Sequence, residues 1–160
     1  MKKGLIFLVT MVLTCSISFS YNSEIMNIAK REYPNDKQMQ QYIYNRQLSA
    51  YNYMATVSDK EVEDIATYEY PNDYSMQQYT YNRQLSSKNY MKTVTDNEVK
   101  NIAIYKYPND YSMQQYTYNR QLSSKNYMRS TTNSRARNKA IRKYPNDYSM
   151  QQYIYDREVY

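Results

Sequence analysis

Apolar residues recur at helical spacing in the segment 58–68, which reads SDKEVEDIATY. Val62, Ile65 and Ala66 fall on one narrow stripe, so the pattern predicts a short amphipathic helix that buries a single face. This helix should end before Pro71, because a proline disfavours helical geometry at the residue that precedes it.

Residues suited to helix caps mark the start of this helix and of the one after it. Ser58 and Glu61 have the spacing of a capping box, in which each side chain bonds a free backbone N–H of the first turn. Asn72 or Asp73 should cap a second, longer helix that runs to about Lys88. The short Tyr-Pro-Asn link between the two helices predicts an antiparallel helical hairpin.

The longer helix carries apolar residues on two opposite sides. At 100° per residue, a helix with this pattern is expected to be sandwiched between two neighbours rather than to lie on a surface. At its end, Asn89 is suited to a left-handed C-cap, or the helix continues and adds Tyr90 and Met91 to its second face. The two predicted faces are Tyr74, Tyr81 and Leu85, with Gln78 between them, and Met76, Tyr79, Thr80 and Arg83.

The hairpin pattern occurs several times along the chain. The sequence YPNDYSMQQYTYNRQL is repeated exactly or nearly so, and its prolines are spaced by 37 residues, at Pro34, Pro71, Pro108 and Pro145. A period in this range is typical of arrays of small units that bury their apolar faces against each other. The predicted fold class is therefore all-α, with about three and a half tandem αα-hairpin repeats stacked as a short solenoid. This fold resembles αα-hairpin solenoids such as tetratricopeptide arrays, but the chain lacks their small-residue signature, so the resemblance implies no activity.

The first twenty residues have the form of a secretory signal peptide. Lys2 and Lys3 precede a short apolar run, and small residues follow it as far as Ser20. We therefore expect a signal peptide over 1–20, a helical repeat domain over 21–160, and a secreted or periplasmic location. A lipoprotein anchored at Cys15 is the rival interpretation, although Thr14 before it fits that motif poorly. No later stretch is apolar enough to span a bilayer.

Composition favours a folded but unusual mature chain. Without the leader the sequence contains no Gly, Cys, His, Trp or Phe, and its net charge falls from +6 to +4. Scarce aliphatic residues are a mark of disorder. The 23 tyrosines offset this, because each can bury a large area. We therefore expect a core made largely of Tyr and Met.

The same composition argues against an enzyme, a metal site or a cofactor. The mature chain has no thiol nucleophile, no imidazole base and no Gly-rich phosphate loop. The acidic residues near 59–64 fit the solvated face of a one-sided helix better than a catalytic pair. An Asp follows each Tyr-Pro-Asn sequence, and helix capping explains these residues better than calcium, which needs six to eight oxygen ligands. These four are Asp36, Asp73, Asp110 and Asp147.

The predicted function is therefore binding, through surfaces rich in Tyr, Gln and Asn. Tyrosine provides a large contact area at a low cost in side-chain entropy. The partner is expected to be a protein, a peptide or a glycan, although plain core packing explains the same spacing. A Tyr-rich, self-assembling structural protein is a further alternative. The candidate binding surface comprises Tyr74, Gln78, Tyr81, Tyr111, Gln115 and Tyr118.

The fourth repeat differs by a run of basic residues with no acid between them. It could bind a polyanion such as nucleic acid or an acidic envelope polymer. Alternatively, it is an eroded copy whose short helix frays into solvent, because Ala136 and Lys139 replace the apolar pair Val62 and Ile65. The candidate polyanion patch comprises Arg129, Arg135, Arg137, Lys139, Arg142 and Lys143.

Overall fold

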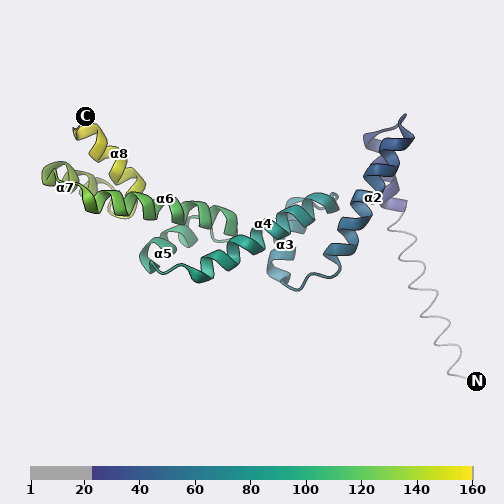
Figure 1. The fold of residues 1–160 in the computed structure, drawn as a ribbon, viewed down its shortest axis with the longest axis horizontal. Coiled ribbons are helices and arrows are strands. Elements are labelled where there is room, and N and C mark those ends of the chain that lie inside the picture. The colour runs from purple at the N-terminus through teal and green to yellow at the C-terminus, as the bar shows by residue number, and fades with distance from the viewer. Residues whose placement is uncertain (1–22, 160) are drawn as a thin grey trace, which may run out of the picture. The chain divides into compact units, whose positions relative to one another are not determined.

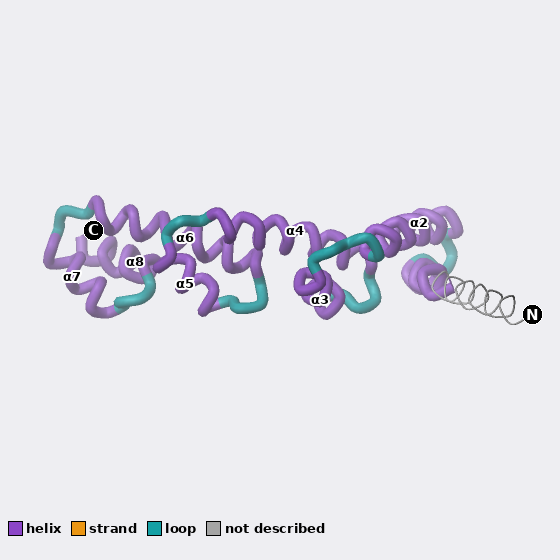
Figure 2. The backbone as a smooth tube through the Cα atoms, turned by 90° about the horizontal axis from the view of Figure 1, so that it is seen from below, coloured by secondary structure: helices purple, strands orange, loops and turns teal. Residues whose placement is uncertain are grey.

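A computed structural model describes residues 23–159, and all regular structure in this range is helical (Figures 1 and 2). The all-α prediction is thus confirmed, whereas the predicted signal peptide and Cys15 lie outside the described residues. Residues 23–32 are helical, and short helices then alternate with long ones. The short helices are α3 (Lys60–Glu69), α5 (Asn97–Lys106) and α7 (Ser134–Lys143). The long ones are α2 (Lys37–Met54), α4 (Tyr74–Thr93) and α6 (Tyr111–Ser130), followed by α8 (Tyr148–Val159).

The chain forms two compact units that divide between Tyr79 and Thr80, within α4. Unit 1 contains the described residues up to Tyr79, and unit 2 contains those from Thr80 onward. In unit 2, α5 packs against α6, α6 packs against α8, and α7 packs against α8 (Figure 1). In unit 2, each short helix therefore lies beside the long helix that follows it.

The short helices begin one residue later than the capping-box prediction placed them. Asp59, not Ser58, is the N-cap of α3, and its carboxylate accepts the N–H of Val62 at 3.3 Å. A carboxylate is well placed there because the positive end of the helix dipole favours a negative charge. Asp96 and Asn133 cap α5 and α7 in the same way.

The Tyr-Pro turn ends each short helix as predicted. The Tyr70 N–H is the last to bond into α3, donating to the carbonyl of Ala66 at 3.1 Å. The Tyr70 carbonyl then accepts the side-chain amide of Gln77 at 2.7 Å, so the first of the two consecutive glutamines ties the turn to the next helix. The same bond recurs from Gln40 to Tyr33, Gln114 to Tyr107 and Gln151 to Tyr144.

The long helices bury one face, so the prediction of two opposite apolar faces is wrong. In α6 the buried side chains follow helical spacing along a single stripe centred on two glutamines, whereas Tyr116 and Arg120 are exposed. Helix α4 continues past Asn89 to Thr93, and α6 continues past the equivalent Asn126 to Ser130. No described residue has the left-handed backbone geometry of the predicted C-cap. The buried stripe of α6 comprises Gln114, Thr117, Tyr118, Gln121, Ser124, Lys125 and Met128.

Apolar clusters in unit 2 combine tyrosine and methionine with small aliphatic residues. One cluster joins Met91 of α4, Val99 and Ala103 of α5, and Tyr118 of α6. The Tyr118 ring also meets the Tyr90 ring edge-on, with centroids 6.4 Å apart. The core predicted to consist of Tyr and Met therefore depends equally on the Val and Ala of the short helices.

Candidate functional site

The candidate binding surface of tyrosines and glutamines is partly buried. Tyr81 and Tyr118 are each only 3% exposed, so these two rings belong to the core and not to a surface. The Tyr118 hydroxyl accepts the N–H of Asp96 at 3.4 Å, which satisfies its polar end inside the fold. The remaining members, Tyr74, Gln78, Tyr111 and Gln115, are half-buried.

Two of the half-buried rings contact the preceding long helix of their own unit. In unit 1 the Tyr74 ring meets Tyr51 edge-on, with centroids 5.2 Å apart. In unit 2 the ammonium group of Lys88 lies 5.3 Å from the centre of the Tyr111 ring. The face predicted to bind a partner is thus largely occupied by contacts within each unit.

A different set of tyrosines is exposed, at one equivalent position of every repeat. Tyr42 and Tyr79 in unit 1 are 58% and 60% exposed, and Tyr116 and Tyr153 in unit 2 are 58% and 52% exposed. Sequence reasoning assigned this position to the second buried face. Its 37-residue recurrence was visible in the sequence, but only the burial pattern shows that the ring faces outward.

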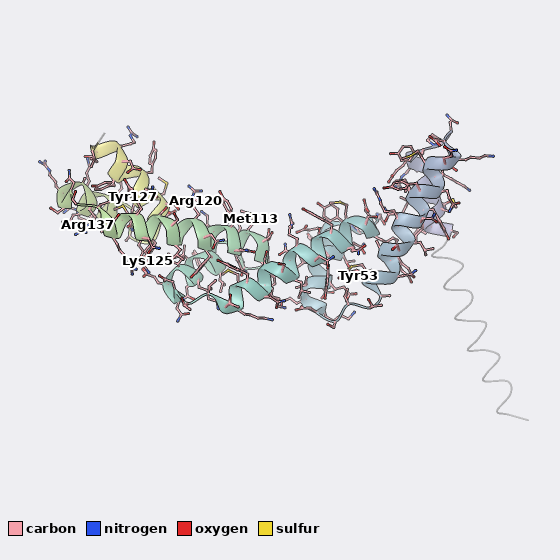
Figure 3. All side chains as sticks on the ribbon, viewed as in Figure 1. Tyr53, Met113, Arg120, Lys125, Tyr127 and Arg137 are labelled. Carbon is pink, nitrogen blue, oxygen red and sulfur yellow. The ribbon has the colours of Figure 1, made fainter. Side chains whose placement is uncertain are left out.

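An arginine follows each of these exposed tyrosines by one helical turn. The guanidinium of Arg157 lies 5.7 Å from the centre of the Tyr153 ring, and its NH1 atom donates to the Tyr153 hydroxyl at 3.4 Å. Arginine thus lies over the tyrosine ring at this pair. In Figure 3, Arg120 points away from α6 on a different side from Lys125.

The repeated aspartates cap the long helices. In α6, Asp110 accepts the N–H of Met113 at 3.0 Å and the hydroxyl of Ser112 at 2.7 Å. Asp36, Asp73 and Asp147 accept the equivalent backbone N–H groups. Capping was preferred over calcium binding, and these hydrogen bonds confirm the capping role. Among the described residues, no group of three acidic, His or Cys side chains is placed to hold a metal ion.

The strongest charge cluster of unit 2 surrounds Lys125. Its ammonium group lies 2.8 Å from an Asp96 oxygen and 2.7 Å from a Glu98 oxygen, and the Tyr148 hydroxyl donates to Glu98 at 2.6 Å. Hydrogen bonding to Lys125 holds the pKa of Asp96 and the pKa of Glu98 below their usual values. Burial, followed by the bond to Glu98, raises the pKa of Tyr148.

Lys125 itself is buried on α6, a position unusual for a lysine. Burial is the largest single influence on its pKa and lowers it, but the two carboxylates together raise the net pKa above the usual value. The ammonium group therefore stays charged. The bonds of this cluster link α5, α6 and α8. Because each of its groups is engaged by another member, the cluster is suited to holding these helices together.

The basic residues of the fourth repeat lie on a complete helix, so the fraying interpretation is wrong. Helix α7 has the same ten-residue length as α3 and α5, and it buries Ala136 and Ala140. Ile154 of α8 contributes to the same cluster. This isoleucine replaces Thr117 of the preceding repeat, which compensates for the smaller Ala136.

The six basic side chains have different local surroundings. Arg129 and Arg137 line one pocket, whereas Arg135 and Lys139 line another together with Glu158. Lys139 pairs with Glu158 at 2.8 Å. Lys143, at the end of α7, lies 5.7 Å from the centre of the Tyr144 ring, and Arg142 is exposed beside it.

The acidic residues of α3 do not converge in a pocket. Asp59 is used as the N-cap, and Glu63 pairs with Lys60 at 2.6 Å on the helix surface. Glu63 lines a pocket beside uncharged side chains. The arrangement offers no pair of carboxylates for acid–base chemistry in that pocket.

Comparison with known proteins gives no lead to the function: no protein-family model, curated protein or solved structure matches the chain. Within the part of the chain that the structure describes, no helix is long and apolar enough to cross a membrane.

Proposed function

We propose that the chain is an exported, non-enzymatic interaction module built from stacked αα-hairpin repeats. In each unit a buried glutamine donates a hydrogen bond to the aspartate that caps the next long helix, from Gln47 to Asp73 and from Gln84 to Asp110. These bonds support the stacking proposal. Export is supported by the form of residues 1–20 alone. The absence of His and Cys from the mature sequence favours binding over catalysis.

The observation that carries the binding proposal is the exposure of one tyrosine in every repeat. Tyr116 and Tyr153 each expose more than half of their surface to water and are not part of the core of unit 2. Tyrosine and arginine are the residues that most often dominate binding energy at protein interfaces, and each of these rings has an arginine one turn later. The same two residue types recur in unit 1. We therefore infer that these exposed rings, rather than Tyr81 and Tyr118, contact a protein, peptide or glycan.

Partner capture with matched tyrosine variants tests this function. The mature chain is used as bait, and the captured species is identified by mass spectrometry and then purified. The variant Y116S/Y153S should lose this partner, because it removes two exposed rings of the long helices. The matched variant Y68S/Y105S removes two tyrosines that are 90% and 91% exposed on short helices, and it should retain the partner. Equal binding by both variants would contradict the proposal.

A second candidate function is the binding of a polyanion through the basic residues of α7. It is favoured by the intact fold of this helix, which carries five basic residues. Binding to heparin or DNA that weakens steeply with salt would support it. Self-assembly is the remaining alternative, and sedimentation over a range of concentrations separates it from a monomeric module.

A further inference from the structure

A pocket of about 350 Å³ opens in unit 2 where α6, α7 and α8 meet. Figure 3 labels two of its lining residues, Lys125 on α6 and Arg137 on α7. The pocket combines basic and apolar side chains on one small surface. The residues that matter for its chemistry are Lys125, Met128, Arg129, Arg137, Ile141 and Tyr148.

The two arginines are the charges that this pocket leaves available. Lys125 is neutralised by Asp96 and Glu98, and Glu98 is also bonded by Tyr148. Among the described residues, neither Arg129 nor Arg137 forms a salt bridge. The charge of Arg129 contributes to the lowered pKa of Asp96. The lining of the pocket contains one carboxylate, Glu98, against three basic side chains, so its charge is positive overall.

Apolar surface lies beside these arginines. Met128 is buried and forms part of the wall, and Ile141 remains 40% exposed. An isoleucine beside two guanidinium groups that form no salt bridge suits a ligand with both a negative and an apolar group. A phosphate or sulfate chain would satisfy only the arginines.

Unit 1 contains an equivalent pocket of about 170 Å³, whose one charged lining residue, Glu63, pairs with Lys60. Its residues Tyr51, Met54 and Tyr74 lie 74 residues, or two repeats, before Lys125, Met128 and Tyr148. Where unit 2 has Arg129 and Arg137, unit 1 has Ala55 and Glu63. The repeat thus preserves the construction of the pocket and changes its charge, as expected if the two pockets select different ligands.

We propose that the unit 2 pocket binds an acidic peptide segment, with carboxylates on Arg129 and Arg137 and a neighbouring apolar side chain against Ile141. Arginine suits this role because its fork of N–H donors matches a carboxylate. The inference rests on the proposed function and names the chemistry of the partner. A peptide is favoured over nucleic acid because only two of the basic residues face this pocket, while Lys139 pairs with Glu158 in another.

Binding of synthetic peptides to the mature chain tests the proposal. A fluorescein-labelled ten-residue peptide of alternating Glu and Leu is titrated with the protein and followed by anisotropy, beside peptides in which Gln or Lys replaces Glu. Only the Glu peptide should bind well. R129A/R137A should weaken its binding roughly tenfold or more, because each charge-assisted hydrogen bond is worth more than a neutral one. R135A/R142A removes the same charge from α7 outside the pocket and should change binding less than about twofold.

Several outcomes would overturn this inference. Equal weakening by the two double variants would indicate diffuse electrostatics, and so would tighter binding of heparin or DNA than of the Glu peptide. Equal binding of the Gln peptide would show that charge is not recognised. If the Glu peptide fails to bind while partner capture still depends on Tyr116 and Tyr153, the pocket inference fails and the proposed function stands. Circular dichroism of each variant confirms that helicity is retained.

Discussion

The side-chain amide of Gln84 bonds to the carboxylate of Asp110, 26 residues later, at 2.9 Å. Its oxygen accepts the N–H of Ser112 at 3.1 Å, so both ends of one fully buried amide are satisfied by the start of the next long helix. A buried amide is tolerated only when it is bonded in this way. The same pair of bonds joins Gln47 to Asp73 and Ser75, and Gln121 to Asp147 and Ser149.

Replacing Gln84 should therefore destabilise unit 2 more than replacing an equivalent-looking glutamine. We expect Q84A to lower the free energy of unfolding by about 1–3 kcal/mol. The substitution leaves the Asp110 carboxylate without one of its donors and the Ser112 N–H without its acceptor. Q115A is the control, since Gln115 is half-buried on α6 and makes no side-chain hydrogen bond among the described residues. Urea unfolding followed by circular dichroism measures both. Equal losses would mean that the Gln84 bonds contribute nothing beyond packing.

The charge cluster around Lys125 should make stability depend on pH in the acid range. The pKa values of Asp96 and Glu98 are lowered in the folded chain, chiefly by hydrogen bonds to Lys125, so their contribution is complete above the unfolded pKa of about 4. It is lost as the pH falls through the lower folded values. We expect K125M to cost about 1–2 kcal/mol at pH 7, less than for a fully buried pair because the Glu98 side chain is 61% exposed.

Thermal unfolding of the wild type and K125M from pH 7 to pH 2 tests this dependence. The difference between their melting temperatures should shrink below about pH 4, as both carboxylates become protonated. K100M is the control, because Lys100 lies on α5 outside this cluster and should show no such convergence. A difference that stays constant down to pH 2 would show that Lys125 stabilises the fold through its hydrocarbon chain and not through its charge.

The sequence was sufficient to predict the helices, because their signals are local. The stripe of Val62 and Ala66 is buried, the Tyr-Pro turn ends α3, and Asp73 accepts a backbone N–H at the start of α4. Each of these features depends on residues within one or two helical turns. A shift of one residue, from Ser58 to Asp59, was the main local error, since both side chains can cap a helix.

The burial pattern of the long helices could not be predicted in the same way. A periodicity argument treats glutamine as polar and therefore as exposed, so neither predicted apolar face includes Gln84. Gln84 and its equivalents are instead the centre of the buried stripe, because their partners lie 26 to 28 residues away in the next repeat. Because the glutamines face the core, Tyr81 and Tyr118 beside them are buried. Tyr79 and Tyr116 are exposed. Consequently two members of the candidate surface, Tyr81 and Tyr118, are buried.

Ala136 and Ile154 should behave as a compensating pair. In the preceding repeat the equivalent residues are Val99 and Thr117, so the larger side chain has moved from the short helix to the long one. We expect I154T to cost about 1–2 kcal/mol, because it removes buried apolar volume beside the small Ala136. The double variant A136V/I154T restores the pair of the preceding repeat and should recover much of this loss.

A double-mutant cycle over these positions measures the coupling. Urea unfolding of A136V, I154T and the double variant should give a favourable interaction energy, since the two side chains share one cluster. The single variant A136V is expected to be neutral or unfavourable, because it overfills the space that Ile154 already occupies. Strictly additive effects would show that the two residues fill separate spaces.

The hydroxyl of Thr80 provides the opposite case, a change that should stabilise the fold. Thr80 is only 1% exposed, and its hydroxyl oxygen makes no hydrogen bond to any residue that the structure describes. The first and fourth repeats carry Ile43 and Ile154 at this position, so an apolar side chain fits there. T80V keeps the shape of the side chain and removes the unbonded hydroxyl, and we expect the free energy of unfolding to rise by about 1 kcal/mol.

The exposed Thr67 on α3 is the control, because T67V buries nothing and should leave the melting temperature unchanged. A loss of stability in T80V would instead show that the hydroxyl is hydrogen-bonded in solution, for example to a buried water molecule.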